Sequence, residues 1–297
     1  MPEAPDITIY VEALQERVKG RSIERVRILG PSVLRSVEPP IEALTGRRVE
    51  DVRSQGKRIV LDVTGGWFLV IHLMIAGRLR WLKPGTRLPG RLSQAAFEFT
   101  NGTLVLTEAG TKKRATILLV EGESALARLD RGGLEVGSAN LASFRETLLS
   151  GNHTLKRALC NPATFSGIGN AYSDEILHAA GLSPVTLTRK LSDAEIERLH
   201  RAARETLESW TARLRKQFAG RFPGPGEVTA FRDDFAVHGR FGKPCPVCGT
   251  NVQRIRYADR ETNYCPRCQT GGRVLADRSL SRLLREDWPR TIDAWEA

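Results

Sequence analysis

The chain has 297 residues, of which 41% are hydrophobic and 27% are charged. A chain of this length can bury one or two full cores, and it contains no apolar run near the roughly 20 residues that a bilayer crossing requires. The net charge of +11 favours a polyanionic partner, most commonly nucleic acid. The acidic start, Met-Pro-Glu-Ala-Pro-Asp, differs from the basic start of a signal peptide, so we expect a cytoplasmic protein.

The first expected element is a helix that begins near Pro5. Pro5 suits the first turn of a helix, and the acidic Glu3 and Asp6 are favourable near the positive end of its dipole. One apolar stripe follows at helical spacing, formed by Ile7, Val11, Leu14 and Val18.

A series of short strand-like runs comes next. Asn101-Gly102, between two of these runs, is a strong hairpin-turn signal. Several short strands at close spacing predict a β-sandwich or a barrel-like module. The expected strands are Arg48–Arg53, Arg58–Val63, Trp67–Leu73, Gly77–Leu82, Ala95–Thr100, Thr103–Thr107 and Ala115–Val120.

The pattern becomes helical after residue 150. We expect a short helix that Thr154 caps and Asn161-Pro162 ends, and a second helix over residues 171–180. Ser192-x-x-Glu195 is a capping box that predicts the start of a long helix. A further short helix is expected around residues 276–286, where the sequence leaves open whether it packs on the preceding segment or binds a partner.

Four of the five cysteines form two knuckles, Cys245-x2-Cys248 and Cys265-x2-Cys268. Two such pairs supply the four thiolates of a tetrahedral zinc ion, and Thr250–Tyr264 between them can form a hairpin. Four protein ligands leave no open position, so we expect one structural zinc ion. A disulfide framework is the weaker alternative because nothing in the sequence indicates secretion. The fifth cysteine, Cys160, is expected to be a buried small apolar side chain.

Two short segments suggest chemistry. Gly167-Ile168-Gly169-Asn170 lets the backbone approach an anion at a helix start, although a glycine turn between helices is often only a turn. Removal of Met1 would leave Pro2 as a secondary amine beside Glu3. Such an amine attacks an aldehyde-level carbon to give a cationic iminium, which is an electron sink for elimination. From Pro2 alone, a chain start without a role is the simpler interpretation.

The ordered set of motifs is more specific than any one of them. The set comprises Met1-Pro2-Glu3-x-Pro5-Asp6, the Lys57 segment, His72-Leu73, Gly167-Ile168-Gly169-Asn170 with Tyr172-x-Asp174-Glu175-Ile176-Leu177, and the cysteine finger with Arg260. Over residues 1 to about 270, this set resembles the formamidopyrimidine-DNA glycosylase / endonuclease VIII family of base-excision-repair enzymes.

The resemblance implies an α+β multidomain fold, with a leading helix and β-sandwich, a helix–two-turn–helix domain and a C-terminal zinc finger. We expect these parts at residues 1–125, 126–232 and 233–273, followed by a helical extension at 274–297. It also implies a monomeric, nucleoid-associated bacterial-type enzyme that acts on double-stranded DNA holding a damaged base or an abasic site in a cleft between two lobes.

The resemblance further implies the roles of individual residues. Pro2 is the expected nucleophile toward deoxyribose C1′ and Glu3 the expected acid/base, with Lys57 and Arg260 also in the catalytic set. The residues expected to contact DNA are His72, Lys156, Asn170, Met74, Ile75 and Lys112. Without the resemblance, His72 between two apolar residues would be a core histidine.

The chain also departs from the family pattern. It has Met74-Ile75 where relatives that excise oxidised purines carry Gly-Met, and Ala109-Gly110-Thr111-Lys112 where they carry a Pro-Arg-Arg-Phe loop. Asp6 stands where many relatives have Glu. The main expectation is a bifunctional glycosylase with AP lyase activity by β- or β,δ-elimination. The alternatives are a lyase or altered-lesion enzyme, for oxidised pyrimidines or crosslinks, and a non-catalytic zinc-containing DNA-binding protein.

Overall fold

The computed structural model describes residues 1–257 and 260–296. They form two compact units, one of residues 1–131 with 210–229 and one of residues 132–209 with 230–297. The long helix α6 (Asp193–Phe218) belongs to the second unit up to Ser209 and to the first from Trp210. These units are coarser than the four domains expected from the sequence, which we retain as a proposal.

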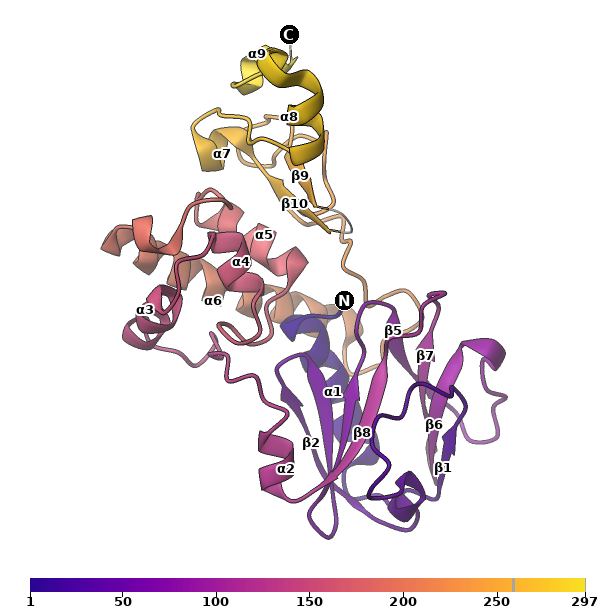
Figure 1. Ribbon diagram of the computed structural model, residues 1–297. Helices are drawn as coiled ribbons and strands as arrows, with labels where there is room; N and C mark the ends of the chain where they lie inside the picture. Colours follow the sequence, from indigo (N-terminus) through magenta and orange to yellow (C-terminus); the bar gives the residue numbers. More distant parts are fainter. Residues whose placement is uncertain (258–259, 297) are drawn as a thin grey trace. The chain divides into compact units, whose positions relative to one another are not determined.

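The first unit contains two antiparallel four-stranded sheets (Figure 1). One has the order β1-β6-β7-β5 and the other β2-β3-β4-β8, so the sandwich expected from the sequence is confirmed. The first sheet consists of β1 (Arg25–Ile28), β5 (Gly77–Leu82), β6 (Ser93–Phe99) and β7 (Gly102–Glu108). The second consists of β2 (Val49–Gln55), β3 (Arg58–Val63), β4 (Trp67–His72) and β8 (Thr116–Glu121).

The sequence predicted the β6–β7 hairpin but did not predict strand β1. The β6–β7 hairpin is present as expected, but its two turn residues are Thr100 and Asn101, one position earlier than expected, because Gly102 already pairs with Phe99. A Cβ atom at Gly102 would lie 2.5 Å from the Trp81 ring, which explains why a glycine is needed there. Strand β1, with two arginines in Arg25–Ile28, has too short an apolar pattern to be expected from the sequence.

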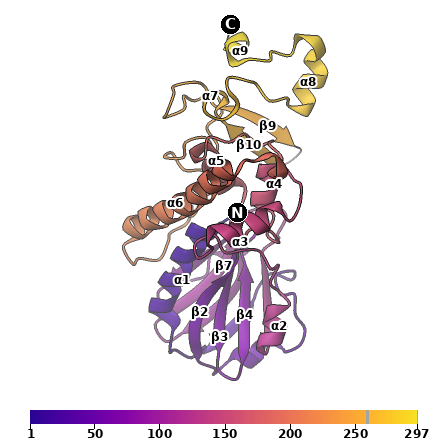
Figure 2. The same cartoon turned by 90° about the vertical axis from the view of Figure 1, so that its left-hand side faces the viewer.

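Helix α1 (Ala4–Val18) covers the sandwich next to β2 (Figure 2). Its apolar stripe is buried with the inner faces of both sheets in one core. Residues 219–229 join this core through Val228 and through Phe222, whose ring lies 5.7 Å from that of Tyr10. The short helix α2 (Glu123–Ala127) covers the outer face of the second sheet through Leu126.

The second unit begins with a helical part made of α3 (Leu141–Leu149), α4 (Leu155–Cys160), α5 (Asn170–Ala179) and most of α6. The rings of Phe144 and Phe165 stack at 4.8 Å in its core. The Glu195 carboxylate accepts from the Ser192 N–H at 2.8 Å, which confirms the capping box of α6. Short 3-10 helices occur at Ile41–Leu44, Gly90–Leu92, Thr188–Lys190 and Arg285–Asp287.

The remainder of the second unit is the finger and its extension. Strands β9 (Gln253–Tyr257) and β10 (Arg260–Tyr264) pair antiparallel, and residues 258–259 of the expected hairpin lie outside the described residues. Helices α7 (Pro266–Thr270), α8 (Arg278–Leu284) and α9 (Ile292–Glu296) follow. The extension packs on the finger, because Leu275 is buried with Ile255 and Tyr264. Within the described residues, no helix has the length and apolar character that crossing a bilayer requires.

Candidate functional site

The start of the chain is held in place by the first turn of α1. The Glu3 N–H donates to Asp6 Oδ2 at 3.0 Å, and the Glu3 side chain accepts from the Asp6 backbone, which completes a capping box. Glu3 and Asp6 are each 2% exposed, and Pro2 is buried. The expected nucleophile and acid/base therefore lie in a fixed, largely dehydrated place.

The local electrostatics favour an uncharged amine at this position. Burial lowers the pKa of the Met1 amino group, because the ammonium form loses its hydration. Glu3 opposes this effect, whereas the cations Arg78 and Lys57 lower the pKa further. Lys57, at the β2–β3 turn, is therefore near enough to the chain start to affect the charge of its amino group.

His72 ends β4 and pairs in register with Arg58 of β3. Burial lowers the pKa of His72 to about 4, and the nearby positive charges of Arg58 and Lys57 contribute to this shift. The imidazole is therefore neutral at neutral pH and offers one N–H donor and one acceptor. Its intermediate exposure differs from that of a core histidine, which the sequence left as an alternative.

The turn between β4 and β5 presents Met74 and Ile75. Met74 has a φ of 52°, which non-glycine residues adopt rarely, and the Ile75 side chain is 55% exposed. The Gly77 N–H donates to the Leu73 carbonyl at 2.9 Å, and a Cβ atom on Gly77 would lie 2.3 Å from that oxygen. A tight turn thus holds a large apolar side chain out in solvent.

A second loop, residues 109–112, lies beside this turn. An added Cβ atom on Gly110 would be 3.5 Å from the Cβ atom of Ala76. The buried Glu108 carboxylate closes the loop by accepting from the Arg114 N–H at 2.9 Å and from the Ala115 N–H. Lys112 is exposed in the loop. The two segments expected to fill space in DNA are neighbours.

Arg78 was not expected from the sequence. Its Nε donates to the Val228 carbonyl at 2.6 Å, and its Nη1 donates to the Ile75 carbonyl at 3.0 Å. It thus joins the β4–β5 turn to residues 150 positions away in the chain. Only these long-range contacts reveal its role, because an arginine near the start of a strand carries no distinguishing sequence signal.

In the second unit, Asn170 is the first residue of α5 and its Nδ2 donates to the Glu261 carbonyl at 3.0 Å. The Lys156 ammonium donates to the Asn170 carbonyl at 2.6 Å, to Ser173 Oγ at 2.8 Å and to Asp174 Oδ1 at 2.6 Å. An ammonium has three donors, so Lys156 braces the start of α5.

Two buried carboxylates of α5 hold the finger segment. Asp174 Oδ2 lies 2.7 Å from His238 Nδ1 and accepts from the Asn263 N–H at 3.1 Å. Glu175 accepts from the backbone N–H groups of residues 236–238. Arg260, exposed at the start of β10, pairs in register with Tyr257. Asn170 and Arg260 therefore lie at the corner where hydrogen bonds join the start of α5 to β10.

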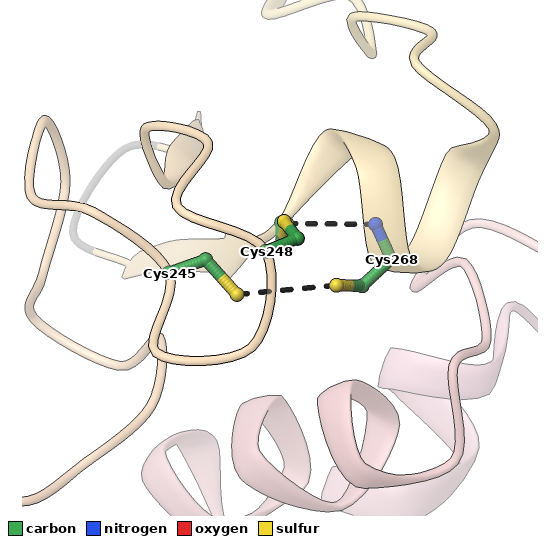
Figure 3. Close-up of side chains that lie close together, drawn as sticks. Cys245, Cys248 and Cys268 are labelled. Carbon is green, nitrogen blue, oxygen red and sulfur yellow. Dashed lines mark hydrogen bonds between the residues drawn. The ribbon is translucent and has the colours of Figure 1, made fainter.

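The four cysteine sulfur atoms all lie within 4.8 Å of one another. Cys245 Sγ is 3.9 Å from Cys268 Sγ (Figure 3), and Cys248 Sγ is 3.4 Å from Cys265 Sγ. A tetrahedron with Zn–S bonds of about 2.3 Å has edges of about 3.8 Å. The thiols fit one structural zinc ion, as the spacing predicted.

Three protein-family models match this chain. They are the formamidopyrimidine-DNA glycosylase N-terminal domain at residues 1–115, its H2TH domain at 135–215, and the zinc finger found in FPG and IleRS at 242–271. A formamidopyrimidine-DNA glycosylase of Heliobacterium modesticaldum is 32% identical over 277 residues, covering 91% of this chain and all of the relative. One from Symbiobacterium thermophilum is 33% identical, covering 91% and 89%.

Solved structures with the same fold include Lactococcus lactis Fpg in complex with abasic-site DNA. It has a TM-score of 0.79 and 24% identity, covering 90% of this chain and 99% of that one. A Lactococcus lactis Fpg mutant with Fapy-dG-containing DNA also has a TM-score of 0.79, at 23% identity, with coverage of 91% and 100%.

The sandwich, the H2TH helices and the four-cysteine finger define a zinc-containing DNA glycosylase of base-excision repair. The chain belongs to the formamidopyrimidine-DNA glycosylase family.

Proposed function

We propose that this protein is a bifunctional DNA glycosylase and AP lyase that acts on double-stranded DNA with a damaged base or an abasic site. The observation that carries the proposal is the chain start, where Pro2 and Glu3 are buried side by side and where burial lowers the pKa of the neighbouring Met1 amino group. The complexes of Lactococcus lactis Fpg with damaged DNA support the choice of substrate.

Once Met1 is removed, the imino nitrogen of Pro2 attacks deoxyribose C1′. The bond from C1′ to the base breaks, the base leaves with its electron pair, and the sugar ring opens to an iminium on Pro2. Glu3 moves protons to and from the ring oxygen, for which its fixed position at the N-cap suits it. The iminium then accepts the electron pair released when a C2′ proton is removed. The C3′–O bond breaks and the strand is cut.

Four residues are proposed to hold DNA phosphates. Lys57 supplies a point charge, and Arg260 supplies a planar fork with several donors. His72 is neutral, so it can donate one N–H to a phosphate without adding a positive charge of its own to the site. Asn170 opens α5, where the first backbone N–H groups attract anions. Lys156 supports this contact through the carbonyl of Asn170.

The damaged nucleotide must leave the base stack to be cut. We propose Ile75 as the main side chain that fills the vacated space, because it is large, apolar and exposed on a tight turn. Met74 supports the turn beside it, and Lys112 of the adjacent loop contacts the DNA backbone. No aromatic residue is present in residues 109–113, which favours a lesion other than oxidised guanine.

A panel of duplexes tests this function, each with one lesion or with a plain abasic site. Base release and strand cleavage are measured separately. We expect cleavage at the abasic site together with base release from at least one lesion. Cleavage without base release from any lesion would reduce the function to that of a lyase. Binding without either reaction would leave only a DNA-binding protein.

A further inference from the structure

Helix α5 carries a polar stripe that faces the finger. Asn170, Asp174 and His178 recur four residues apart and therefore lie on one side of the helix. Each contacts the finger: Asn170 the Glu261 carbonyl, Asp174 the Asn263 N–H and His178 the sulfur of Cys245. The proposed function uses the start of this stripe, whereas it gives His178 no role.

His178 Nε2 lies 3.3 Å from Cys245 Sγ. His178 is 8% exposed and Cys245 is 2% exposed, so solvent reaches this contact poorly. A cysteine bound to zinc is a thiolate, which can accept a hydrogen bond but cannot donate one. The hydrogen between the two atoms must then belong to the imidazole.

We propose that His178 is a positioning residue of the zinc centre, in which its Nε2–H donates to the Cys245 thiolate. Four thiolates around one dication leave a net negative charge that burial makes costly. Hydrogen bonds to sulfur offset that cost. Cys265 Sγ has such a donor in the Cys268 N–H at 3.5 Å, and His178 supplies the corresponding bond to Cys245.

The contact also ties the zinc centre to the helix that presents Asn170. His178 and Asn170 are two helical turns apart on α5, and both are bonded to the finger. Partners beyond the direct ligands orient those ligands and commonly change metal affinity by about 10- to 100-fold. We therefore expect the loss of His178 to weaken zinc binding without removing a ligand.

The test compares zinc retention in the full-length parent, His178→Phe and His178→Gln. Zinc loss to an excess of a chelator is followed with a colorimetric zinc indicator. Phenylalanine keeps a large ring without a donor, so His178→Phe should bind zinc about tenfold or more weakly. Glutamine keeps an N–H, so His178→Gln should recover part of the affinity. Equal zinc retention in all three proteins would overturn the proposal.

His200→Phe is the matched control. His200 is also 8% exposed, and its Nε2 lies 3.0 Å from the Ala139 carbonyl, away from the cysteines. It should lose stability without losing zinc affinity, and equal zinc loss in His200→Phe and His178→Phe would refute a specific role for His178.

A measurement on the parent protein needs no variant. With cadmium-113 in place of zinc, NMR should detect the Nε2–H form of His178 and a coupling from that hydrogen to the metal through sulfur. The Nδ1–H form would contradict the proposal.

Discussion

Asn170 Nδ2 donates to the Glu261 carbonyl at 3.0 Å, which fixes the first residue of α5 against the strand that Arg260 begins. Lys156 and Asp174 brace the same corner, with the ammonium on the Asn170 carbonyl and the Asp174 carboxylate on the Asn263 N–H. Two proposed phosphate contacts, one from a helix start and one from a hairpin, are thus held in one arrangement before DNA binds. Such preorganisation reduces the entropic cost of binding.

Arg260→Ala should weaken binding to abasic-site duplex and lower the slope of log K against log salt by about one, since one phosphate contact is lost. Fluorescence anisotropy at several salt concentrations measures both. Arg267→Ala is the control, because Arg267 is also an exposed finger arginine but pairs with Asp293 at 3.0 Å. An Arg260→Ala slope equal to that of the parent would exclude Arg260 from the interface.

Stability should depend on the protonation of His72. Its pKa is lowered from 6.5 to about 4 in the folded protein, so the unfolded chain binds the proton more readily between these values. With respect to His72, the folded protein therefore has its full stability above pH 6.5, and it loses stability as the pH falls from 6.5 toward 4. The loss amounts to about 3.5 kcal/mol at most, because one pKa unit is worth about 1.4 kcal/mol.

The corresponding measurement is urea unfolding of the parent and of His72→Gln at several pH values. The difference between their free energies of unfolding should change across this pH range and stay constant above pH 7. A difference that does not vary with pH would show that His72 is not held neutral by burial.

The C-terminal extension should stabilise the hairpin of the finger. Asp277 Oδ2 accepts from the Arg256 N–H at 2.6 Å, and Leu275 packs on Ile255. Removing a buried acceptor costs about 1–3 kcal/mol, so Asp277→Ala should speed amide hydrogen exchange at Arg256. Leu283→Ala, in the same extension but 78% exposed, is the control and should leave exchange unchanged. Equal exchange in Asp277→Ala and the parent would contradict this role.

Local sequence patterns predicted the elements that are stabilised by contacts between residues close together in the sequence. The stripe of α1, the β6–β7 hairpin and the capping box of α6 each depend on residues a few positions apart, and the zinc site depends on two short spacings. Strand β1 was missed because its short sequence, Arg25–Ile28, becomes a strand only by pairing with β6.

The rest depends on contacts between distant residues. The role of Arg78 follows from its hydrogen bond to Val228, and that of His178 from its contact with Cys245. Neither residue lies in a sequence motif that would have indicated its role. The roles of Pro2 and Glu3 came from the resemblance to a family. The structure adds the buried capping box of Glu3 and Asp6 and the lowered pKa of the Met1 amino group, which support those roles as proposals.

The most direct test of the proposed mechanism is covalent trapping on duplex DNA that contains one abasic site. Borohydride reduces an iminium to a stable amine, so the methionine-free protein should give a protein–DNA band on a denaturing gel. Pro2→Gly should lose most of this band, whereas Pro5→Ala, at the start of the same helix, should keep it. An undiminished band in Pro2→Gly would contradict the assignment of Pro2 as the nucleophile.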